Sequence, residues 1–278
     1  MSILVSPSEL NNLIHTGKRF TLLASVWEPG PAGSYGLFSS LHIPTARFCD
    51  AAAALAGIPG SQFGRNPLPD PANLQKWFQR WGLEDDRPVI VYDEGRGLMA
   101  GRAWWILRWA GIKDVSILDG GFQNWREQGY PTLAGPGNIA VESDSQVRPG
   151  SLPTATIEEV KAHEGLLIDT REPNRFAGFR ENLDLKAGHI PGAINVPERA
   201  FHKPDGTWKS KKEICDAFVK AGANEENLKD AIIYSGSGNH SGLAIAAMEW
   251  AGLPVPRHFV GGWSQWSANP KNPVERGL

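Results

Sequence analysis

The feature that most restricts how this 278-residue chain can fold is an internal repeat. Short motifs occur twice in the same order, each time among segments typical of a buried strand and an amphipathic helix. They are His42–Pro44 and Gly188–Gly192, Tyr92–Asp93 and Tyr234–Ser235, Trp109–Gly111 and Trp250–Gly252, Gly120–Phe122 and Gly261–Trp263, and Trp125 and Trp266. A repeat of strand and helix predicts two similar α/β domains, each with a central parallel sheet flanked by helices.

The expected boundary between the two copies lies in residues 134–153, which are rich in Gly, Pro and Ser. We therefore predict an N-terminal domain over 1–133, a linker over 134–153 and a C-terminal domain over 154–278. A chain of this length can supply two domains that each bury their own core.

Composition excludes several functional classes. The chain is 41% hydrophobic with a net charge of −2, and its Lys and Arg residues are scattered. This favours neither a nucleic acid nor a membrane surface as partner. We expect no signal peptide and no transmembrane helix, because no apolar run approaches the ~18 residues that a span requires. Cys49 and Cys215 lie far apart and show no metal-ligand spacing, so we expect no metal or cofactor and a cytoplasmic, reducing compartment.

The stretch from Asp230 to Ala244 has the strongest chemical signal. The apolar run Ala231–Tyr234 predicts a buried strand, and the small residues that follow predict a tight loop. Apolar residues at helical spacing begin near Ser241. Such a strand, loop and helix N-terminus aim backbone N–H groups at one point, which favours an anion. Ser235 ends the strand at the position best suited to a nucleophile, although an ordinary βα turn has the same pattern.

Together these motifs resemble the tandem-domain rhodanese family, the thiosulfate and 3-mercaptopyruvate sulfurtransferases. The resemblance covers nearly the whole chain and is carried by motifs in the second half: Asp169–Arg171, Gly188–Gly192, Ser235–Gly238 and Gly261–Trp266. It implies a parallel sheet flanked by helices in each half, with the chemistry in the C-terminal half. Asp93 occupies the nucleophile position of the first half, which fits a non-catalytic domain.

The chain departs from the family at the nucleophile. Family members have a cysteine where this chain has Ser235. A thiolate accepts a sulfane sulfur as a persulfide, and backbone donors at a helix N-terminus lower a thiol pKa. A serine hydroxyl cannot hold sulfur in this way, so we expect the chain as it stands to be nearly inactive. A deliberate Cys-to-Ser replacement and a natural homologue without activity are both open, and the otherwise complete site favours the first.

The resemblance also assigns residues to the substrate. Arg175 matches the arginine that binds the anionic donor, since a planar guanidinium suits a carboxylate or thiosulfate. Arg180 is the candidate for a second cation. The loop residues Gly236, Gly238, Asn239 and His240 are expected to contact the donor, with His240 exposed on the loop or lining the mouth of the pocket.

A proton relay of the mercaptopyruvate type is implied less completely. Ser237 matches the loop serine, and Asp50 matches the aspartate from the first domain. Asn66 stands where the relay histidine is expected, and an amide cannot exchange protons near neutral pH. This departure puts the relay in doubt.

We therefore expect a sulfurtransferase that moves sulfur from a small anionic donor, 3-mercaptopyruvate before thiosulfate, to cyanide or a thiol such as that of a thioredoxin-like protein. The alternative is a catalytically dead homologue that binds an anion or a partner. A phosphatase of this fold would need arginine at Ser241, and a serine hydrolase would need Gly-x-Ser-x-Gly around its nucleophile, so neither is favoured.

Overall fold

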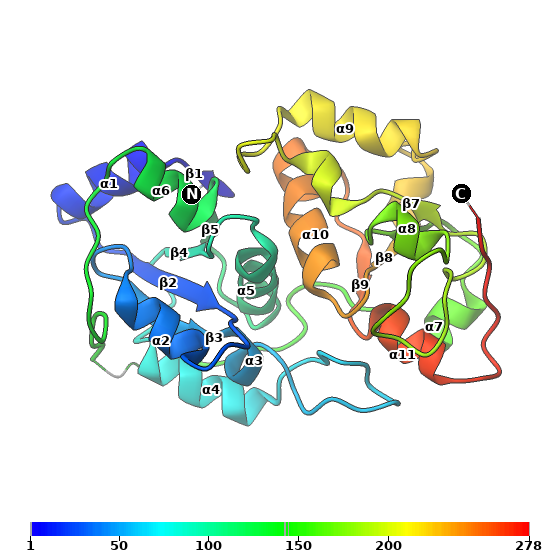
Figure 1. Cartoon of the computed structure of the whole chain (residues 1–278), viewed down its shortest axis with the longest axis horizontal. Helices are drawn as coiled ribbons and strands as arrows, with labels where there is room; N and C mark the ends of the chain where they lie inside the picture. The colour runs from blue at the N-terminus through cyan, green and yellow to red at the C-terminus, as the bar shows by residue number, and fades with distance from the viewer. Residues whose placement is uncertain (1, 142, 144, 278) are drawn as a thin grey trace. The chain divides into compact units, whose positions relative to one another are not determined.

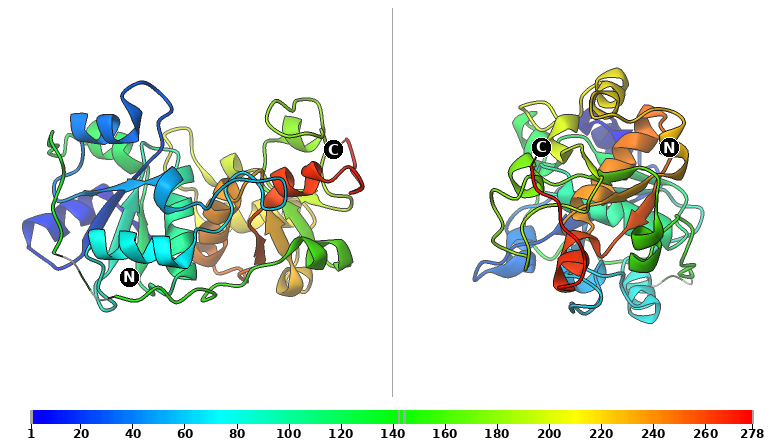
Figure 2. Two further views of the ribbon diagram at one scale, coloured as in Figure 1. Left: turned by 90° about the horizontal axis from the view of Figure 1, so that it is seen from below. Right: turned by 90° about the vertical axis from the view of Figure 1, so that its right-hand side faces the viewer.

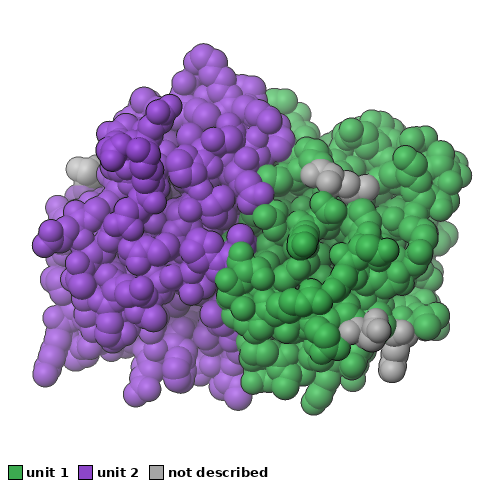
Figure 3. All heavy atoms as spheres, turned by 180° about the vertical axis from the view of Figure 1, so that it is seen from behind, with its two compact units in different colours: residues 1–56, 69–151, 203–208 green, residues 57–68, 152–202, 209–278 purple. Residues whose placement is uncertain are grey.

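The computed structural model describes residues 2–141, 143 and 145–277. The chain forms two compact units, coloured separately in Figure 3. Unit 1 comprises residues 1–56, 69–151 and 203–208, and unit 2 comprises 57–68, 152–202 and 209–278. Residues 57–68 thus belong to unit 2 and residues 203–208 to unit 1, although each segment lies in the other half of the sequence. Whether the predicted boundaries also separate independently folding domains stays a prediction.

Unit 1 is built on a parallel sheet with strand order β1-β5-β4-β2-β3. Its strands are β1 (Leu4–Val5), β2 (Thr21–Val26), β3 (Arg47–Asp50), β4 (Val89–Tyr92) and β5 (Val115–Leu118). Its helices are α1 (Pro7–His15), α2 (Gly33–Ser40), α3 (Ala51–Ala54), α4 (Pro71–Arg80), α5 (Leu98–Trp109) and α6 (Gly121–Glu127).

Helices cover both faces of this sheet (Figures 1 and 2). On one face, apolar side chains of α1, α2 and α6 share a core with those of the strands, including Leu10, Phe38 and Trp125. On the other face, α5 packs on β2, β4 and β5 and is itself covered by α3. Every residue of the central strands β2 and β4 is buried, so these strands do not alternate between apolar and exposed polar residues.

Unit 2 has a parallel sheet with strand order β7-β6-β8-β9. Its strands are β6 (Leu167–Asp169), β7 (Ile194–Asn195), β8 (Ile232–Tyr234) and β9 (Arg257–Phe259). Its helices are α7 (Ile157–Ala162), α8 (Pro173–Phe176), α9 (Lys211–Lys220), α10 (Asn239–Ala251) and α11 (Gly262–Ala268), with short 3-10 helices η1 (Glu198–Phe201) and η2 (Asn227–Asp230).

Its core is again divided between the two faces of the sheet. Residues of α7 and α11 pack with the strands on one side, while α10 packs on β8 and is covered by α9 and η1 on the other. Capping boxes begin α7 at Thr156 and α9 at Ser210. The second is the one that the Ser210–Glu213 spacing predicts from the sequence. Among the described residues, no helix is long and apolar enough to span a membrane.

The predicted duplication is confirmed by the order of the strands. The series β3-β2-β4-β5 of unit 1 corresponds to β7-β6-β8-β9 of unit 2. Asp93 follows β4 and Ser235 follows β8, so both stand at equivalent strand ends. The hydroxyl oxygens of Tyr92 and Tyr234 accept hydrogen bonds from the backbone N–H groups of Ile43 and Ile190, at 3.2 and 3.1 Å.

Two local expectations need correction. Helix α10 begins at Asn239, two residues before the expected Ser241, because Gly238 adopts a left-handed backbone conformation (φ +87°) and turns the chain directly into the helix. The sequence also places Cys215 on the helix that follows Ser210 and predicts it as a small core residue. It is only half-buried on α9, because the inward positions of that helix are taken by Ile214 and Phe218.

Candidate functional site

The loop between β8 and α10 is a close turn built around Ser235. Its backbone N–H at Gly238 donates a 3.0 Å hydrogen bond to Ser235 Oγ. The carbonyl oxygens of Ser235 and Gly236 accept hydrogen bonds from the N–H groups of Trp263 and Ser264 at the start of α11. The loop is therefore fixed at both sides, and the hydroxyl lies inside it.

The corresponding loop of unit 1 shows which kind of group such a turn holds. There the Asp93 carboxylate accepts four backbone hydrogen bonds of 2.9–3.3 Å, from Gly95, Gly97, Met99 and Ala100. Gly97, like Gly238, has a left-handed conformation and precedes the helix. Related loops thus enclose a carboxylate in unit 1, where Gly97 is four residues after Asp93, and a hydroxyl in unit 2, where Gly238 is three residues after Ser235.

Three guanidinium groups converge on the loop of unit 2. A methyl group built on Gly236 would lie 3.0 Å from Arg65 Nη2, 3.4 Å from Arg175 Nη1 and 3.9 Å from Arg171 Cδ. A side chain at position 236 would therefore press against the ends of Arg65 and Arg175. Arg175, a predicted substrate-binding residue, lies beside the loop, and its role stays a prediction; Arg65 and Arg171 are cations that the sequence did not assign to the site.

Buried carboxylates hold these arginines in place. Arg175 Nη2 donates to Glu181 Oε1 at 2.8 Å and to Asp184 Oδ2 at 2.9 Å, and Arg65 Nη1 pairs with Asp184 Oδ1. The two carboxylate side chains are 4% and 3% exposed, so the ion pairs lie largely out of water. The paired Nη2 of Arg175 faces the carboxylates while its Nη1 faces the loop, so the side chain is oriented toward Gly236.

Arg171 forms the innermost part of this cluster. It is bonded to both oxygens of the Asp169 carboxylate and lies over the Trp263 ring, with Cζ 4.6 Å from the ring centre. Burial opposes its charge, but the Asp169 carboxylate outweighs burial and the pKa of Arg171 is raised. Its Nη1 makes no hydrogen bond to any described residue and lies 3.7 Å from Glu181 Oε2. Burial and the nearby Arg175 lower the pKa of Arg65.

Segment 57–68 brings both Arg65 and Asn66 to the loop. The Arg65 N–H donates to Ser264 Oγ at 3.0 Å, and Asn66 Nδ2 donates to Ser237 Oγ at 2.8 Å. Gly64 permits this approach: it has φ +85°, and a side chain there would collide with the Gly261 carbonyl at 2.6 Å. Asn66 thus contacts the predicted loop serine, as a donor rather than as a proton acceptor.

The other predicted site residues are placed as follows. Asp50 belongs to unit 1, where its carboxylate caps α3 by accepting hydrogen bonds from Ala52 and Ala53. Arg180 is exposed, and its side chain has no ion pair or hydrogen bond to any described residue. Asn239 and His240 form the first turn of α10, so His240 is half-buried on a helix rather than exposed on the loop. Burial and Arg175 lower the pKa of His240 to about 4.

A buried hydrogen-bonded chain lies beneath the loop and was not predicted. Ser235 Oγ is 3.1 Å from Ser241 Oγ on α10, and Ser241 Oγ is 2.7 Å from His258 Nε2 on β9. All three side chains are fully buried. The sequence reasoning treated Ser241 only as the place of an absent phosphatase arginine. The signal that could have identified the pair was the repeat itself, which places the polar His258 where the first half has the apolar Ile117.

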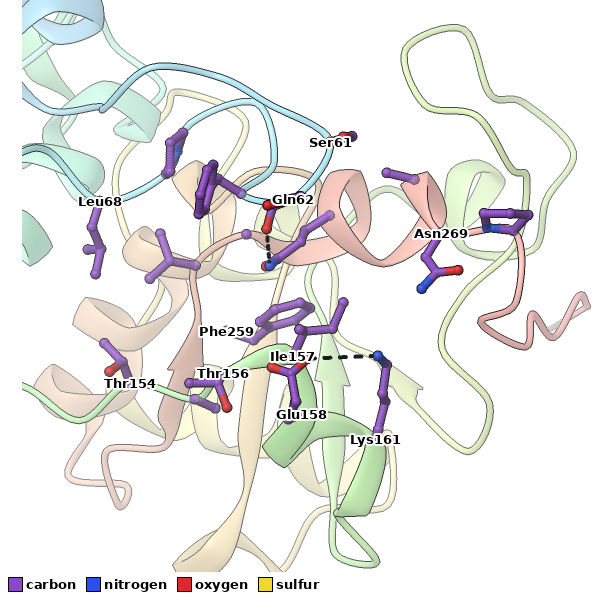
Figure 4. Close-up of a pocket in the computed structure, with 18 residues that line it drawn as sticks. Ser61, Gln62, Leu68, Thr154, Thr156, Ile157, Glu158, Lys161, Phe259 and Asn269 are labelled. Carbon is purple, nitrogen blue, oxygen red and sulfur yellow. Dashed lines mark hydrogen bonds and ion pairs between the residues drawn. The ribbon is translucent and has the colours of Figure 1, made fainter.

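A cavity of about 850 Å³ in unit 2 lies outside this cluster. Figure 4 shows it between segment 57–68 and the elements α7, β9 and α11, with Phe259 and Ile157 among its apolar lining and Glu158 and Lys161 at its edge. None of the site residues named above lines it. Within the described parts of the chain, no group of three His, Cys, Asp or Glu residues could hold a metal ion.

Comparison with known proteins identifies both halves. The rhodanese-like domain family matches residues 6–128 and 153–269. A putative thiosulfate sulfurtransferase, SseB of Mycobacterium tuberculosis, is 34% identical over 99% of this chain and 97% of its own. A probable 3-mercaptopyruvate sulfurtransferase of Pseudomonas aeruginosa is 36% identical over 88% of each chain. The crystal structure of SseA from Escherichia coli, described as a 3-mercaptopyruvate sulfotransferase, has a TM-score of 0.82 at 27% identity, covering 95% of this chain and all of SseA.

Proposed function

The chain belongs to the family of rhodanese-like domain proteins, in tandem form, and from this premise we propose the following reaction for it. A sulfane sulfur moves from a small anionic donor to cyanide or a cellular thiol through a persulfide at position 235. With Ser235 in that position, the chain as it stands does not complete the reaction. We place it in the cytoplasm, where the acceptor thiol would stay reduced.

The observation that carries this proposal is the meeting of two anion-binding features at Gly236. The loop below is the counterpart of the one that encloses the Asp93 carboxylate in unit 1, and its Gly238 N–H donates to the side chain at position 235. Above it, Arg65 and Arg175 each present one guanidinium nitrogen to the loop. An anionic donor bound there would place its sulfur against position 235, because both features point to the same residue.

In the reaction, a thiolate at position 235 attacks the donor sulfur and forms an S–S bond. The carbon–sulfur bond of 3-mercaptopyruvate breaks, and pyruvate leaves as its enolate, which takes up a proton. Cyanide then attacks the outer sulfur, thiocyanate leaves and the thiolate is regenerated. An alkoxide of Ser235 is not available near neutral pH, and an oxygen-bound sulfur would not form a comparable persulfide, so the cycle needs cysteine.

The preference for 3-mercaptopyruvate over thiosulfate rests on Ser237. Its oxygen already accepts a hydrogen bond from Asn66 Nδ2, at 2.8 Å, so its own proton is available for the donor's oxygen. The keto oxygen of 3-mercaptopyruvate gains negative charge as the enolate forms. It would accept a hydrogen bond from the Ser237 hydroxyl. Because Asn66 cannot carry a proton further, we propose that Ser237 stabilises charge rather than passing protons on to Asp50.

Access to position 235 requires local opening. Ser235 is fully buried in the structure, beneath the converging side chains of Arg65 and Arg175. Arg65 and Asn66 both come from segment 57–68, whose backbone is held mainly by Ser264 and Gln265 of α11. We propose that this segment opens to admit the donor and then closes over it again, so that Arg65 and Asn66 return to the loop, and that the donor's carboxylate takes the place of a carboxylate partner at Arg175.

The test compares the chain with its Ser235→Cys variant. Each protein is mixed with 3-mercaptopyruvate, and separately with thiosulfate, before its intact mass is recorded; cyanide is then added and thiocyanate is measured. The cysteine variant should gain one sulfur atom and release it as thiocyanate, with 3-mercaptopyruvate the better donor. Equal activity of both proteins would assign the sulfur to Cys49 or Cys215 and refute the proposed site.

A binding module without turnover is the second candidate. It is favoured by the apolar side chains of Phe179, Leu183 and Leu185, which are 76%, 66% and 81% exposed on the segment that carries Glu181 and Asp184. Exposed apolar side chains beside a pocket are typical of a protein-binding surface. Absence of sulfur loading in the Ser235→Cys variant, with a folded protein, would favour this function.

A further inference from the structure

A chain of hydrogen bonds runs from Ser235 to His258 through Ser241 Oγ, which contacts both of the other side chains. Its three residues come from separate parts of the fold. Ser235 follows β8, Ser241 lies in the first turn of α10, and His258 is central in β9. The contacts between these side chains are 3.1 and 2.7 Å, and no side chain in the series is exposed. A buried polar group costs free energy unless it is bonded, so this placement calls for a reason.

Unit 1 shows that the fold itself does not need these polar residues. In β4 and β5, Val91 pairs with Ile117, as Ile233 pairs with His258 in β8 and β9. Counting from the left-handed glycine before each helix, Ala100 in α5 corresponds to Ser241 in α10. The non-catalytic unit therefore has an apolar pair, Ala100 and Ile117, where the unit with the loop nucleophile has Ser241 and His258.

We propose that Ser241 and His258 form a buried proton relay for the nucleophile at position 235. The inference rests on the proposed function, in which that position bears a thiol. The thiol proton passes to Ser241 Oγ while the hydroxyl proton of Ser241 passes to His258 Nε2. The products are a thiolate that accepts a hydrogen bond from Ser241 and an imidazolium at His258, so no other bond changes and no oxidant is needed.

In this scheme Ser241 is a catalytic residue because it touches the reacting atom, and His258 is a positioning residue that acts through it. Two interactions stabilise the thiolate in this scheme. The Ser241 hydroxyl donates a hydrogen bond to the charged sulfur, and the imidazolium of His258 places a positive charge two hydrogen bonds away. The proton also stays in the protein, so the thiolate is present before the donor arrives.

The charged groups nearest position 235 are three arginines, Arg65, Arg171 and Arg175, and the Asp169 carboxylate that pairs with Arg171. A guanidinium is protonated at any pH used for thiol titration. His240, with a pKa lowered to about 4, is neutral there. Tyr234 precedes the nucleophile, and burial raises its pKa well above its usual range. On β9 itself, the neighbouring Arg257 pairs with Asp230 and Glu159 instead. A thiol titration near neutral pH therefore reports on position 235 and His258.

The experiment measures the thiol pKa by the ultraviolet absorbance of the thiolate across pH, in the Ser235→Cys protein. The parent chain carries the other two cysteines, so subtracting its titration isolates position 235. Into the Ser235→Cys protein we introduce Ser241→Ala, His258→Ile, both together, and Ser241→Thr. Alanine and isoleucine are the residues that unit 1 has at these places, so both replacements suit the fold, and circular dichroism checks folding.

We expect a thiol pKa below the free value of about 8.5 in the Ser235→Cys protein. Ser241→Ala and His258→Ile should each raise it by about one to two pH units, because each removes a hydrogen-bonded stabilisation of a charged group. The double replacement should raise it no further than either one, as members of one relay are not additive. Ser241→Thr should keep the low pKa. Below the thiol pKa, kcat should fall in parallel while the KM for the donor stays the same.

An unchanged thiol pKa in both single replacements would overturn the relay. A rise in Ser241→Ala alone would also overturn it, since His258 would then play no part. These readings need no sulfur donor. If the thiol pKa values shift as expected but the Ser235→Cys protein takes up no sulfur, the relay stands and the proposed function fails. If the protein takes up sulfur but neither replacement shifts the thiol pKa, the proposed function stands and the relay fails.

Discussion

The preference of such a loop for an anion can be tested in unit 1, where the anion is part of the chain. In unit 1, Asp93 Oδ1 accepts from Gly95 and Gly97 at 3.0 Å, and Oδ2 accepts from Met99 and Ala100 at 2.9 and 3.3 Å. Asp93 is 6% exposed, so water cannot replace these bonds. The substitution Asp93→Asn keeps the shape of the side chain but turns one oxygen into an NH₂ group.

The magnitude follows from the count of donors. Whichever way the amide turns, its nitrogen faces two backbone N–H groups, and donors cannot bond to a donor. A buried donor without a partner costs about 1–3 kcal/mol, so two of them cost about 2–6 kcal/mol of the free energy of unfolding. The matched control is Glu94→Gln, which removes one charge from the next residue. Burial and Asp93 raise the pKa of Glu94, so its charge does not favour the folded state and the control should not destabilise unit 1.

The assay must resolve the two units, because two compact units need not unfold as one. Hydrogen exchange followed by mass spectrometry reports on peptides from α5 and from α10 separately. Asp93→Asn should speed exchange in the α5 peptide strongly and leave the α10 peptide near its parent rate. If Asp93→Asn and Glu94→Gln gave the same stability, the claim that this loop selects a negative charge would be refuted, and with it the main support for an anion at Ser235.

Three further outcomes are expected. In the Ser235→Cys protein, Arg65→Ala and Arg175→Ala should each raise the KM for the donor by about one to two decades, whereas Arg180→Ala, at an exposed side chain, should change it far less. Steady-state thiocyanate release measures these KM values, and a large effect of Arg180→Ala alone would make Arg180 the second cation. Because the pKa of His240 is lowered from 6.5 to about 4, the unfolded chain takes up the His240 proton at a higher pH than the folded chain does. The free energy of unfolding should therefore fall by no more than about 3 kcal/mol between pH 6.5 and pH 4, and His240→Asn should reduce this fall in unfolding measured as a function of pH. Trp263→Phe removes the indole hydrogen bond to the Lys186 carbonyl at 2.9 Å and weakens the contact with a guanidinium, so urea unfolding should show a loss of about 1–3 kcal/mol, and a neutral result would mean the ring only fills space.

The sequence by itself determined the features that depend on neighbours in the chain. Hydrophobic runs bounded by turn residues placed β4 and β8, and the repeated motifs around Tyr92 and Tyr234 predicted two sheets of the same strand order. Ser210 with Glu213 marked the start of α9. Such patterns are readable because strand and helix periodicity, capping and turns act over a few residues.

The tertiary structure alone decided which side chains meet at the site. Asn66 reaches Ser237 across 171 residues of sequence, and Arg65 reaches Asp184 across 119. No local sequence pattern predicts either contact. Gly64 permits the close approach of the backbone, but the packing of segment 57–68 in unit 2 determines which residues meet.

The buried relay was hidden for a related reason. Ser241 and His258 come together only because α10 lies against β8 and β9, and a serine in a helix or a histidine in a strand is unremarkable when each is considered alone. The linear chain shows which residues could carry charge or protons, whereas burial and long-range contact determine which of them act together, because both depend on residues far apart in the sequence.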